Sequence, residues 1–112
     1  MPFIDVKTNI PVPADKAEAV KTALGRAITA LPGKSESWLM VCIEPEKQMW
    51  FKGDSAPLAM VQVQTYGVNA QGSDKLTAQI TEILSTELGL SPDRIYVALS
   101  GTPNWGWNGS NF

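Results

Sequence analysis

The sequence contains no histidine and a single cysteine, Cys42, among its 112 residues. With neither an imidazole nor a second thiol, one chain cannot assemble a disulfide framework or a metal site of nitrogen and sulfur ligands. A serine or cysteine nucleophile would also have no histidine to activate it, which excludes hydrolysis by a catalytic triad. We therefore expect an activity that uses no metal, cofactor or disulfide.

Charged residues and long apolar runs are also scarce. Charged residues make up 18% of the chain, and the nine lysines and arginines are scattered without forming a basic stripe. Nucleic acid and anionic membrane are therefore poor partners. No run reaches the roughly 18 apolar residues of a membrane span, and the first nine residues, which include Asp5, are unlike a signal peptide. These features predict a cytoplasmic protein.

The spacing of apolar residues predicts one domain, residues 1–112, built from two halves that each run strand, helix, strand. Two helices are expected on one face of a four-stranded mixed sheet, which is an α+β fold. The opposite face would stay apolar with no third helix to cover it, and this favours an oligomer. The expected strands are 3–8, 38–43, 58–66 and 95–99, with a shorter one at 49–51, and the expected helices are 14–31 and one that Ser73 caps and Gly89 ends.

Pro2 follows the initiator Met1, and a small second residue is the usual condition for removal of that methionine. Removal would expose a secondary amine, and free α-amino groups titrate at about 7.7–8.0, already close to neutrality. Burial, or a positive charge such as Lys34, would lower the pKa into the range that suits a general base. On position alone, a second-position proline more commonly does nothing beyond directing the cleavage.

Lys34 comes directly after the helix stop Pro32-Gly33 and before a predicted strand. An ammonium group there could stabilise the enolate oxygen that forms when a carbon next to a carbonyl loses its proton. Spacing alone favours a simpler interpretation, a solvated lysine that interacts with the helix dipole.

Aromatic side chains are candidates for a pocket that excludes water and stacks on an aryl substrate. Trp105 and Trp107 lie in a tail rich in glycine and asparagine, which cannot form a core of its own. We therefore expect the tail to dock on the rest of the chain. The full set of candidates is Trp38, Tyr66, Trp105, Trp107 and Phe112.

Four segments, taken in their order along the chain, resemble the family of macrophage migration inhibitory factor and D-dopachrome tautomerase. They are Met1-Pro2-Phe3-Ile4, Gly33-Lys34, Ser91-Pro92-Asp93-Arg94-Ile95-Tyr96 and Gly106-Trp107-Asn108-Gly109-Ser110-Asn111-Phe112. The resemblance covers nearly the whole chain and implies a homotrimer with active sites at the subunit interfaces. It also implies an isomerase, a keto–enol tautomerase acting on small α-keto acids or aryl pyruvates.

The resemblance further implies a role for particular residues. Pro2 would be the catalytic base, and Lys34 would bind the substrate carboxylate or carbonyl. The backbone amide near Tyr66 would match the family's substrate-binding amide, while Tyr96 resembles the tyrosine that a neighbouring subunit contributes. The aromatic pocket would be lined by Trp38, Trp107 and Phe112.

The sequence departs from the family pattern at several positions. Ala98 stands where the family has an asparagine two residues after that tyrosine, which removes a polar substrate contact. Tyr66 replaces a side chain that is often smaller, which would narrow the pocket. The paired cysteines of some animal members would fall near Leu58 and Val61, so thiol–disulfide oxidoreductase activity is not expected.

Two other functions stay open at this point. The chain could be a trimeric cytokine-like or interaction protein with a vestigial pocket, which Ala98 and a retained Met1 would favour. The same proline could instead serve an isomerase of hydroxymuconate-like diacids or a decarboxylase. Relatives of that kind usually need extra arginines in the pocket, and only Arg26 and Arg94 are available here.

Overall fold

The computed structural model describes residues 1–67 and 71–112. In this part of the chain, four strands form one sheet in the order β2-β1-β3-β4. Strand β1 runs parallel to β2 and antiparallel to β3, and β3 runs parallel to β4, so the sheet is mixed as expected. The strands are β1, Pro2–Thr8; β2, Met40–Glu44; β3, Ala59–Tyr66; and β4, Ile95–Thr102.

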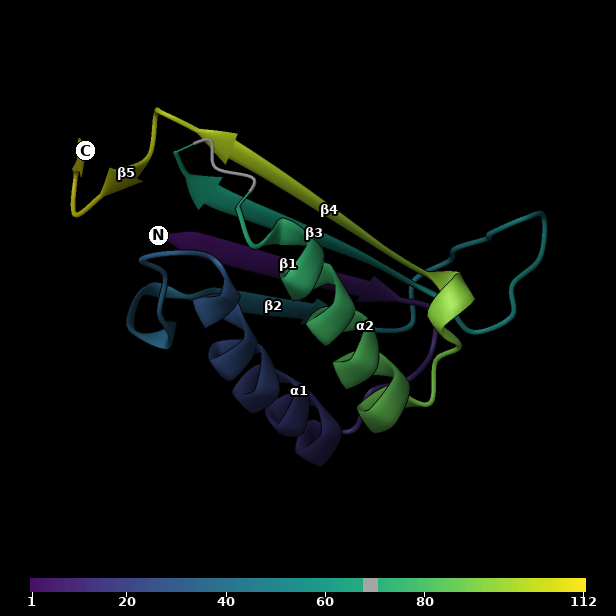
Figure 1. Ribbon diagram of the computed structural model, residues 1–112. Helices are drawn as coiled ribbons and strands as arrows, with labels where there is room; N and C mark the ends of the chain where they lie inside the picture. Colours follow the sequence, from purple (N-terminus) through teal and green to yellow (C-terminus); the bar gives the residue numbers. More distant parts are fainter. Residues whose placement is uncertain (68–70) are drawn as a thin grey trace.

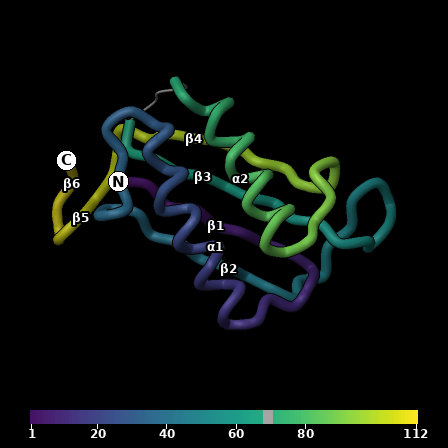
Figure 2. Tube along the Cα trace, turned by 60° about the horizontal axis from the view of Figure 1, so that its bottom comes forward, coloured from purple at the N-terminus to yellow at the C-terminus, as the bar shows by residue number. Residues whose placement is uncertain are grey.

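The helices α1, Ala14–Ala27, and α2, Ser73–Leu88, cover the same face of this sheet (Figure 1). They lie side by side over the sheet (Figure 2). Neither is long and apolar enough to cross a membrane, and no other described residues form such a helix. The core lies between the helices and the sheet, and it includes Val20, Leu24, Leu76, Ile80 and Leu84 from the helices and Ile4, Val6, Val61 and Val63 from the strands.

The predicted order of elements is confirmed, but several boundaries differ. Helix α1 ends at Ala27 and tightens into the 3-10 helix η1, Ile28–Ala30, because a tighter last turn gives the end carbonyls hydrogen-bond partners. Ser73 is the first residue of α2, and the N-cap is Gly72, whose φ of +83° suits a glycine. The glycines at positions 67 and 72 predict a loop over residues 67–72, part of which lies outside the described residues.

The expected strands at 38–43 and 49–51 are wrong in part. Trp38 belongs to the short 3-10 helix η2, Glu36–Trp38, and β2 begins only at Met40. Residues 49–51 form no strand, because Phe51 makes a single isolated bridge to Asp54. Both segments contain a short run of apolar side chains on irregular backbone. In a sequence, such a short run has the same pattern as a buried strand.

The sheet face away from the helices is mixed in polarity, which corrects the expectation of an apolar surface. Met40 is 68% exposed at the start of β2, so within one chain that strand is covered on one face only. Successive side chains of a strand point to opposite faces of the sheet. The residues that lie between the core positions therefore point to this face. The strand register arranges them in three rows: Met40, Phe3, Gln64, Ser100; Cys42, Asp5, Gln62, Ala98; and Glu44, Lys7, Met60, Tyr96.

Candidate active site

The start of β1 lies at the end of the molecule where both chain termini are found (Figure 1). Pro2 is buried there and pairs with Thr65 of β3. The next residue of β3, Tyr66, donates its backbone N–H to the Met1 carbonyl oxygen at 3.2 Å. The backbone amide that the resemblance assigned to substrate therefore binds the first residue of the chain in this structure.

Lys34 reaches this point from a turn that its neighbours determine. The Lys34 N–H donates to the Leu31 carbonyl at 3.1 Å, and Gly33 has a φ of +76°. Proline followed by glycine at the two central positions is typical of a type II turn, because proline fixes the first φ and glycine accepts the positive one. The turn directs the Lys34 ammonium to β3, where Nζ donates to the Tyr66 carbonyl at 3.1 Å.

The amino end of the chain lies in an environment that disfavours positive charge. The pKa of the Met1 α-amino group is lowered from its ordinary value, first by burial and then by the charge of Lys34 and a hydrogen bond with it. An amine held at this place therefore loses its proton more easily than one in water. This is the electrostatic condition that a nitrogen base needs near neutral pH.

A cavity of about 130 Å³ opens beside Lys34. This volume is below the roughly 300 Å³ at which ligand pockets usually begin, so one chain provides only part of a substrate site. A second hollow of about 140 Å³ adjoins it through Thr65 and includes Trp105. The first cavity is lined by Leu31, Pro32, Lys34, Thr65 and Tyr66.

The tail folds back as a hairpin of two short strands, β5, Gly106–Trp107, and β6, Ser110–Asn111. Its turn residues Asn108 and Gly109 have φ values of 52° and 87°. Asparagine followed by glycine is the preferred pair for a tight hairpin turn that needs two positive φ angles. The hairpin places Phe112 next to β3, and the Phe112 N–H donates to the Trp105 carbonyl at 3.0 Å.

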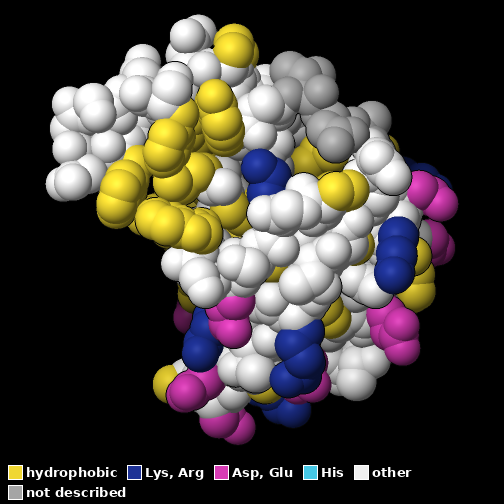
Figure 3. All heavy atoms as spheres, turned by 60° about the vertical axis from the view of Figure 1, so that its left-hand side comes forward, with side chains coloured by type: hydrophobic (Ala, Val, Ile, Leu, Met, Phe, Trp, Pro, Cys, Tyr) yellow, Lys and Arg dark blue, Asp and Glu magenta, His cyan; other side chains and the backbone are white. Residues whose placement is uncertain are grey.

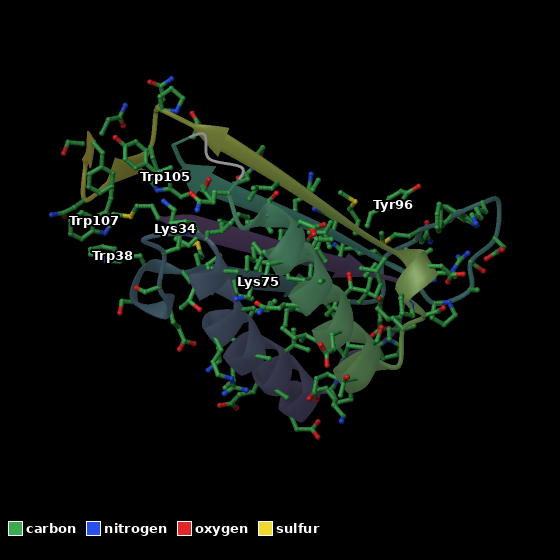
Figure 4. All side chains as sticks on the ribbon, in the orientation of Figure 1. Lys34, Trp38, Lys75, Tyr96, Trp105 and Trp107 are labelled. Atoms are coloured by element: carbon green, nitrogen blue, oxygen red, sulfur yellow. The ribbon has the colours of Figure 1, made fainter. Side chains whose placement is uncertain are left out.

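Four aromatic rings form a continuous series from β3 to η2. The Tyr66 ring lies 5.5 Å from that of Phe112, Phe112 is nearly parallel to Trp107 at 6.4 Å, and Trp107 meets Trp38 edge to face at 5.1 Å. The expected docking of the tail is therefore confirmed. Figure 3 shows hydrophobic side chains gathered beside a basic one at this end of the molecule, and Figure 4 shows Lys34 close to Trp38 and Trp107.

The family model for macrophage migration inhibitory factor (MIF) matches residues 1–112. The chain belongs to this family. The Rattus norvegicus protein named macrophage migration inhibitory factor is 30% identical, over 100% of this chain and 99% of its own length. The Gallus gallus protein named D-dopachrome decarboxylase is also 30% identical, over 94% of this chain and 90% of its own.

Solved structures of family members share the fold. Leishmania major MIF2 superimposes with a TM-score of 0.92 at 31% identity, covering 100% of this chain and 97% of that one. The macrophage migration inhibitory factor homologue from Prochlorococcus marinus gives a TM-score of 0.86 at 26% identity, with 98% of both chains covered. The two-helix, four-stranded architecture is therefore that of the MIF family.

Tyr96 is the one assigned residue that lies far from this site within the chain (Figure 4). It pairs with Met60, five residues along β3 from Thr65, a separation of about 17 Å at 3.4 Å per residue. Its ring lies 4.9 Å from that of Phe51. The assignment of Tyr96 to a neighbouring subunit of a MIF-type assembly therefore stays a prediction.

Neither arginine lines the cavity beside Lys34 among the described residues. Arg94 holds the loop before β3, donating to the carbonyls of Phe51, Asp54, Ala56 and Pro57. Arg26 lines a groove between the two helices. The arginines that a diacid isomerase would need are absent from this part of the site.

Sequence reasoning did not assign Thr65 to the site. Thr65 lies at the cavity because it is opposite Pro2 in an antiparallel pair, and register of that kind follows from packing. Trp105 is one of the aromatic candidates for the pocket, and it lines the hollow that adjoins the cavity. The signal available for it was its place in the tail, which the hairpin brings against the ends of β3 and β4.

Proposed function

We propose that this member of the MIF family is a keto–enol tautomerase of the phenylpyruvate or dopachrome type, acting on small α-keto acids in the cytoplasm. Pro2 would serve as its acid and base once Met1 is removed. The observation that carries this proposal is the lowered pKa of the amino terminus, which burial and the neighbouring Lys34 produce. Pro2 is one residue further along the strand and is itself buried, so the same causes would act on its nitrogen.

The reaction needs one proton to move from carbon to oxygen. The neutral Pro2 nitrogen takes a proton from the carbon next to the ketone, and the electrons of that bond form a carbon–carbon double bond. The ketone oxygen becomes an enolate, which the Lys34 ammonium stabilises by a charge-assisted hydrogen bond. Protonated Pro2 then gives its proton to this oxygen. No atom is gained or lost, so the protein would be an isomerase without a cofactor.

The aromatic series supports an aryl substrate. Phe112 and Trp107 are about half exposed beside Tyr66, so each offers a ring face to a ligand next to the cavity. Stacking on such faces, together with the Lys34 charge for a carboxylate, matches the two ends of an aryl pyruvate. The name of the chicken relative, D-dopachrome decarboxylase, also points to an aryl substrate.

A homotrimer would complete the site. The cavity in one chain is too small for an aryl keto acid, and Tyr96 is about 59% exposed at the opposite end of the sheet. A head-to-tail arrangement would bring that end of one subunit to the Lys34 end of the next, and such contacts close into a ring when the rotation permits.

The test is a Pro2→Gly variant whose Met1 removal is verified by mass spectrometry. General acid–base catalysis contributes about 10²- to 10⁴-fold, so phenylpyruvate turnover should fall by a factor in that range. Pro103→Gly is the matched control, because Pro103 is exposed and lies outside the cavity. Undiminished turnover in the Pro2 variant would show that the base is another group.

A second candidate is a trimeric interaction or cytokine-like protein, which retention of Met1 would favour. In that form the Pro2 nitrogen is an amide and the Met1 carbonyl accepts the Tyr66 N–H. An amide nitrogen has no basic lone pair, so this form could bind but could not abstract a proton. Mass spectrometry of the native N-terminus separates the two, since only loss of Met1 permits the tautomerase.

A further inference from the structure

Tyr96 is exposed, yet a second aromatic ring restrains it. Its side chain is 59% exposed, and β4 is an edge strand, so within the sheet only Met60 of β3 lies beside it. The Tyr96 hydroxyl makes no hydrogen bond within the described residues. The ring of Phe51 lies 4.9 Å away at an angle of 59°, a tilted arrangement that aromatic pairs favour over a face-to-face sandwich. This ring contact therefore restrains the direction in which Tyr96 projects.

The backbone of a tight turn fixes the position of Phe51. The Phe51 N–H donates to the Asp54 carbonyl at 2.9 Å, and the Asp54 N–H donates to the Phe51 carbonyl at 3.1 Å. The two residues between them, Lys52 and Gly53, have φ values of 53° and 80°. Two successive positive φ angles are typical of the tight turns of two-residue hairpins. The turn therefore gives Phe51 a defined backbone position although no longer strand supports it.

Arg94 connects this turn to the start of β4. Its guanidinium lies 5.3 Å from the centre of the Phe51 ring, within the roughly 6 Å over which an aromatic face attracts a cation. The same group donates to the Phe51 carbonyl at 3.3 Å and forms an ion pair with Asp54 at 2.9 Å. The Arg94 side chain is only 14% exposed, so water competes little for these contacts. One short segment thus contains both Tyr96 and the arginine that holds its aromatic partner.

We propose that Phe51 is a positioning residue for substrate binding: Arg94 holds it, and its ring sets the orientation of Tyr96. The inference rests on the proposed function, in which Tyr96 of one subunit contacts the substrate in the site of the next. Phe51 itself does not touch the substrate. It removes alternative rotamers of an exposed tyrosine, and a side chain that is ordered in advance loses less entropy when the substrate binds.

The expected effect is moderate and lies in KM. Ordering one side chain and forming one aromatic pair each change affinity by about 2- to 10-fold, so Phe51→Ala should raise KM for phenylpyruvate by a factor in that range. Its kcat should stay within about twofold of the wild type, because Pro2 and Lys34, which would carry the proton transfer, are unchanged. Phe51→Tyr keeps the ring and should restore the wild-type KM.

A double-mutant cycle separates positioning from a general loss of structure. In a Tyr96→Ala background, Phe51→Ala should raise KM no further, because the side chain on which Phe51 acts is missing. Trp50→Ala is the matched control. Trp50 is the neighbouring aromatic residue in the sequence, it is 67% exposed, and its ring contacts no other ring among the described residues. This control should leave KM unchanged.

A second readout does not depend on activity. The chain has two tyrosines, Tyr66 and Tyr96, so protein labelled with 3-fluorotyrosine should give separate fluorine NMR signals that Tyr66→Phe assigns. In Phe51→Ala the Tyr96 signal should narrow and move toward that of free 3-fluorotyrosine, because its ring then rotates freely, while the Tyr66 signal stays in place. Arg94→Lys keeps a cation but loses the planar set of donors, and it should move the Tyr96 signal in the same direction.

Three results would overturn the inference. They are a Tyr96 signal of unchanged width in Phe51→Ala, an equal rise of KM in Trp50→Ala, and a rise of KM on Phe51→Ala that is as large in the Tyr96→Ala background as in the wild type. Failure of the proposed function would look different: the wild type would not turn over phenylpyruvate, while the fluorine signals would still decide whether Phe51 orients Tyr96.

Discussion

Replacement of Lys34 with glutamine tests whether its charge acts on both the amino terminus and the substrate. The substitution keeps an N–H donor, on a side chain one atom shorter than that of lysine, whose Nζ now donates to the Tyr66 carbonyl at 3.1 Å. It removes the positive charge. The backbone turn is retained, because it depends on Pro32 and Gly33 and on the Lys34 N–H rather than on the side chain. We therefore expect the fold to survive and the chemistry to change.

Two effects follow from the loss of charge. Removal of one donor to a developing oxyanion typically lowers kcat by about 10²- to 10³-fold. Because glutamine removes the charge but keeps an N–H donor, and because Lys34 is partly exposed, the loss should lie at the lower end of that range. The pKa of the terminal amine should also rise toward its ordinary value, because burial remains but the contribution of Lys34 is gone. Since the neutral amine is the active form, the acid limb of the kcat/KM profile should move to higher pH.

The assay is phenylpyruvate tautomerisation across a pH series, with Met1 removal verified in each protein. Lys75→Gln is the matched control, since it makes the same charge change on α2, away from the cavity (Figure 4). It should leave kcat and the midpoint of the acid limb as in the wild type. An equal loss in both variants, or a midpoint that stays still or moves to lower pH with Lys34→Gln, would refute the proposed role of this charge.

Three further predictions concern the site and the fold. Trp107→Ala should raise KM for phenylpyruvate more than for pyruvate in steady-state kinetics, and equal effects would contradict a stacking role. Thr8→Val should lower the free energy of unfolding in urea by about 1–3 kcal/mol, because it leaves the buried Leu58 carbonyl without the hydroxyl that donates to it at 2.7 Å. Gly72→Ala should lower the free energy of unfolding in the same urea assay by clearly more than Gly89→Ala. Both glycines have a positive φ, but a Cβ at Gly72 would lie 2.0 Å from the backbone of η1, whereas a Cβ at Gly89 would have no atom within 4 Å. Equal losses of unfolding free energy in the two glycine variants would contradict this, because they would show that the backbone strain at positive φ accounts for the whole effect.

Much of the fold could be predicted because its signals are local. The alternation along β3 and the apolar stripe of α2 each follow from residues close in sequence, and both elements formed where expected. The expected end of the first helix at Pro32-Gly33 was correct only for the helical region as a whole, because α1 ends at Ala27 and the 3-10 helix η1 continues to Ala30. Trp38 and residues 49–51 were assigned wrongly to strands, because a short apolar run has the same appearance in a strand and in a packed loop.

The candidate site, like the fold, could be predicted only in part. The residues Pro2 and Lys34 could be named from the sequence, but their proximity depends on Tyr66, which bonds to both Met1 and Lys34 from a strand more than thirty residues further along the chain. Cys42 has no second thiol in the sequence to pair with, and only the parallel register of β1 and β2 places the carboxylates of Asp5 and Glu44 near it.

The sequence by itself determined which reactive groups this protein has: a proline after a removable methionine, a lysine after a turn, an aromatic tail and no histidine. The tertiary structure decided which of these groups meet, placing the amino end beside Lys34 and the four rings in series while leaving Tyr96 at the far end of the sheet. The physical reason is that turns and helices depend on neighbouring residues, whereas strand register and the pKa of a buried amine depend on groups that only packing brings together.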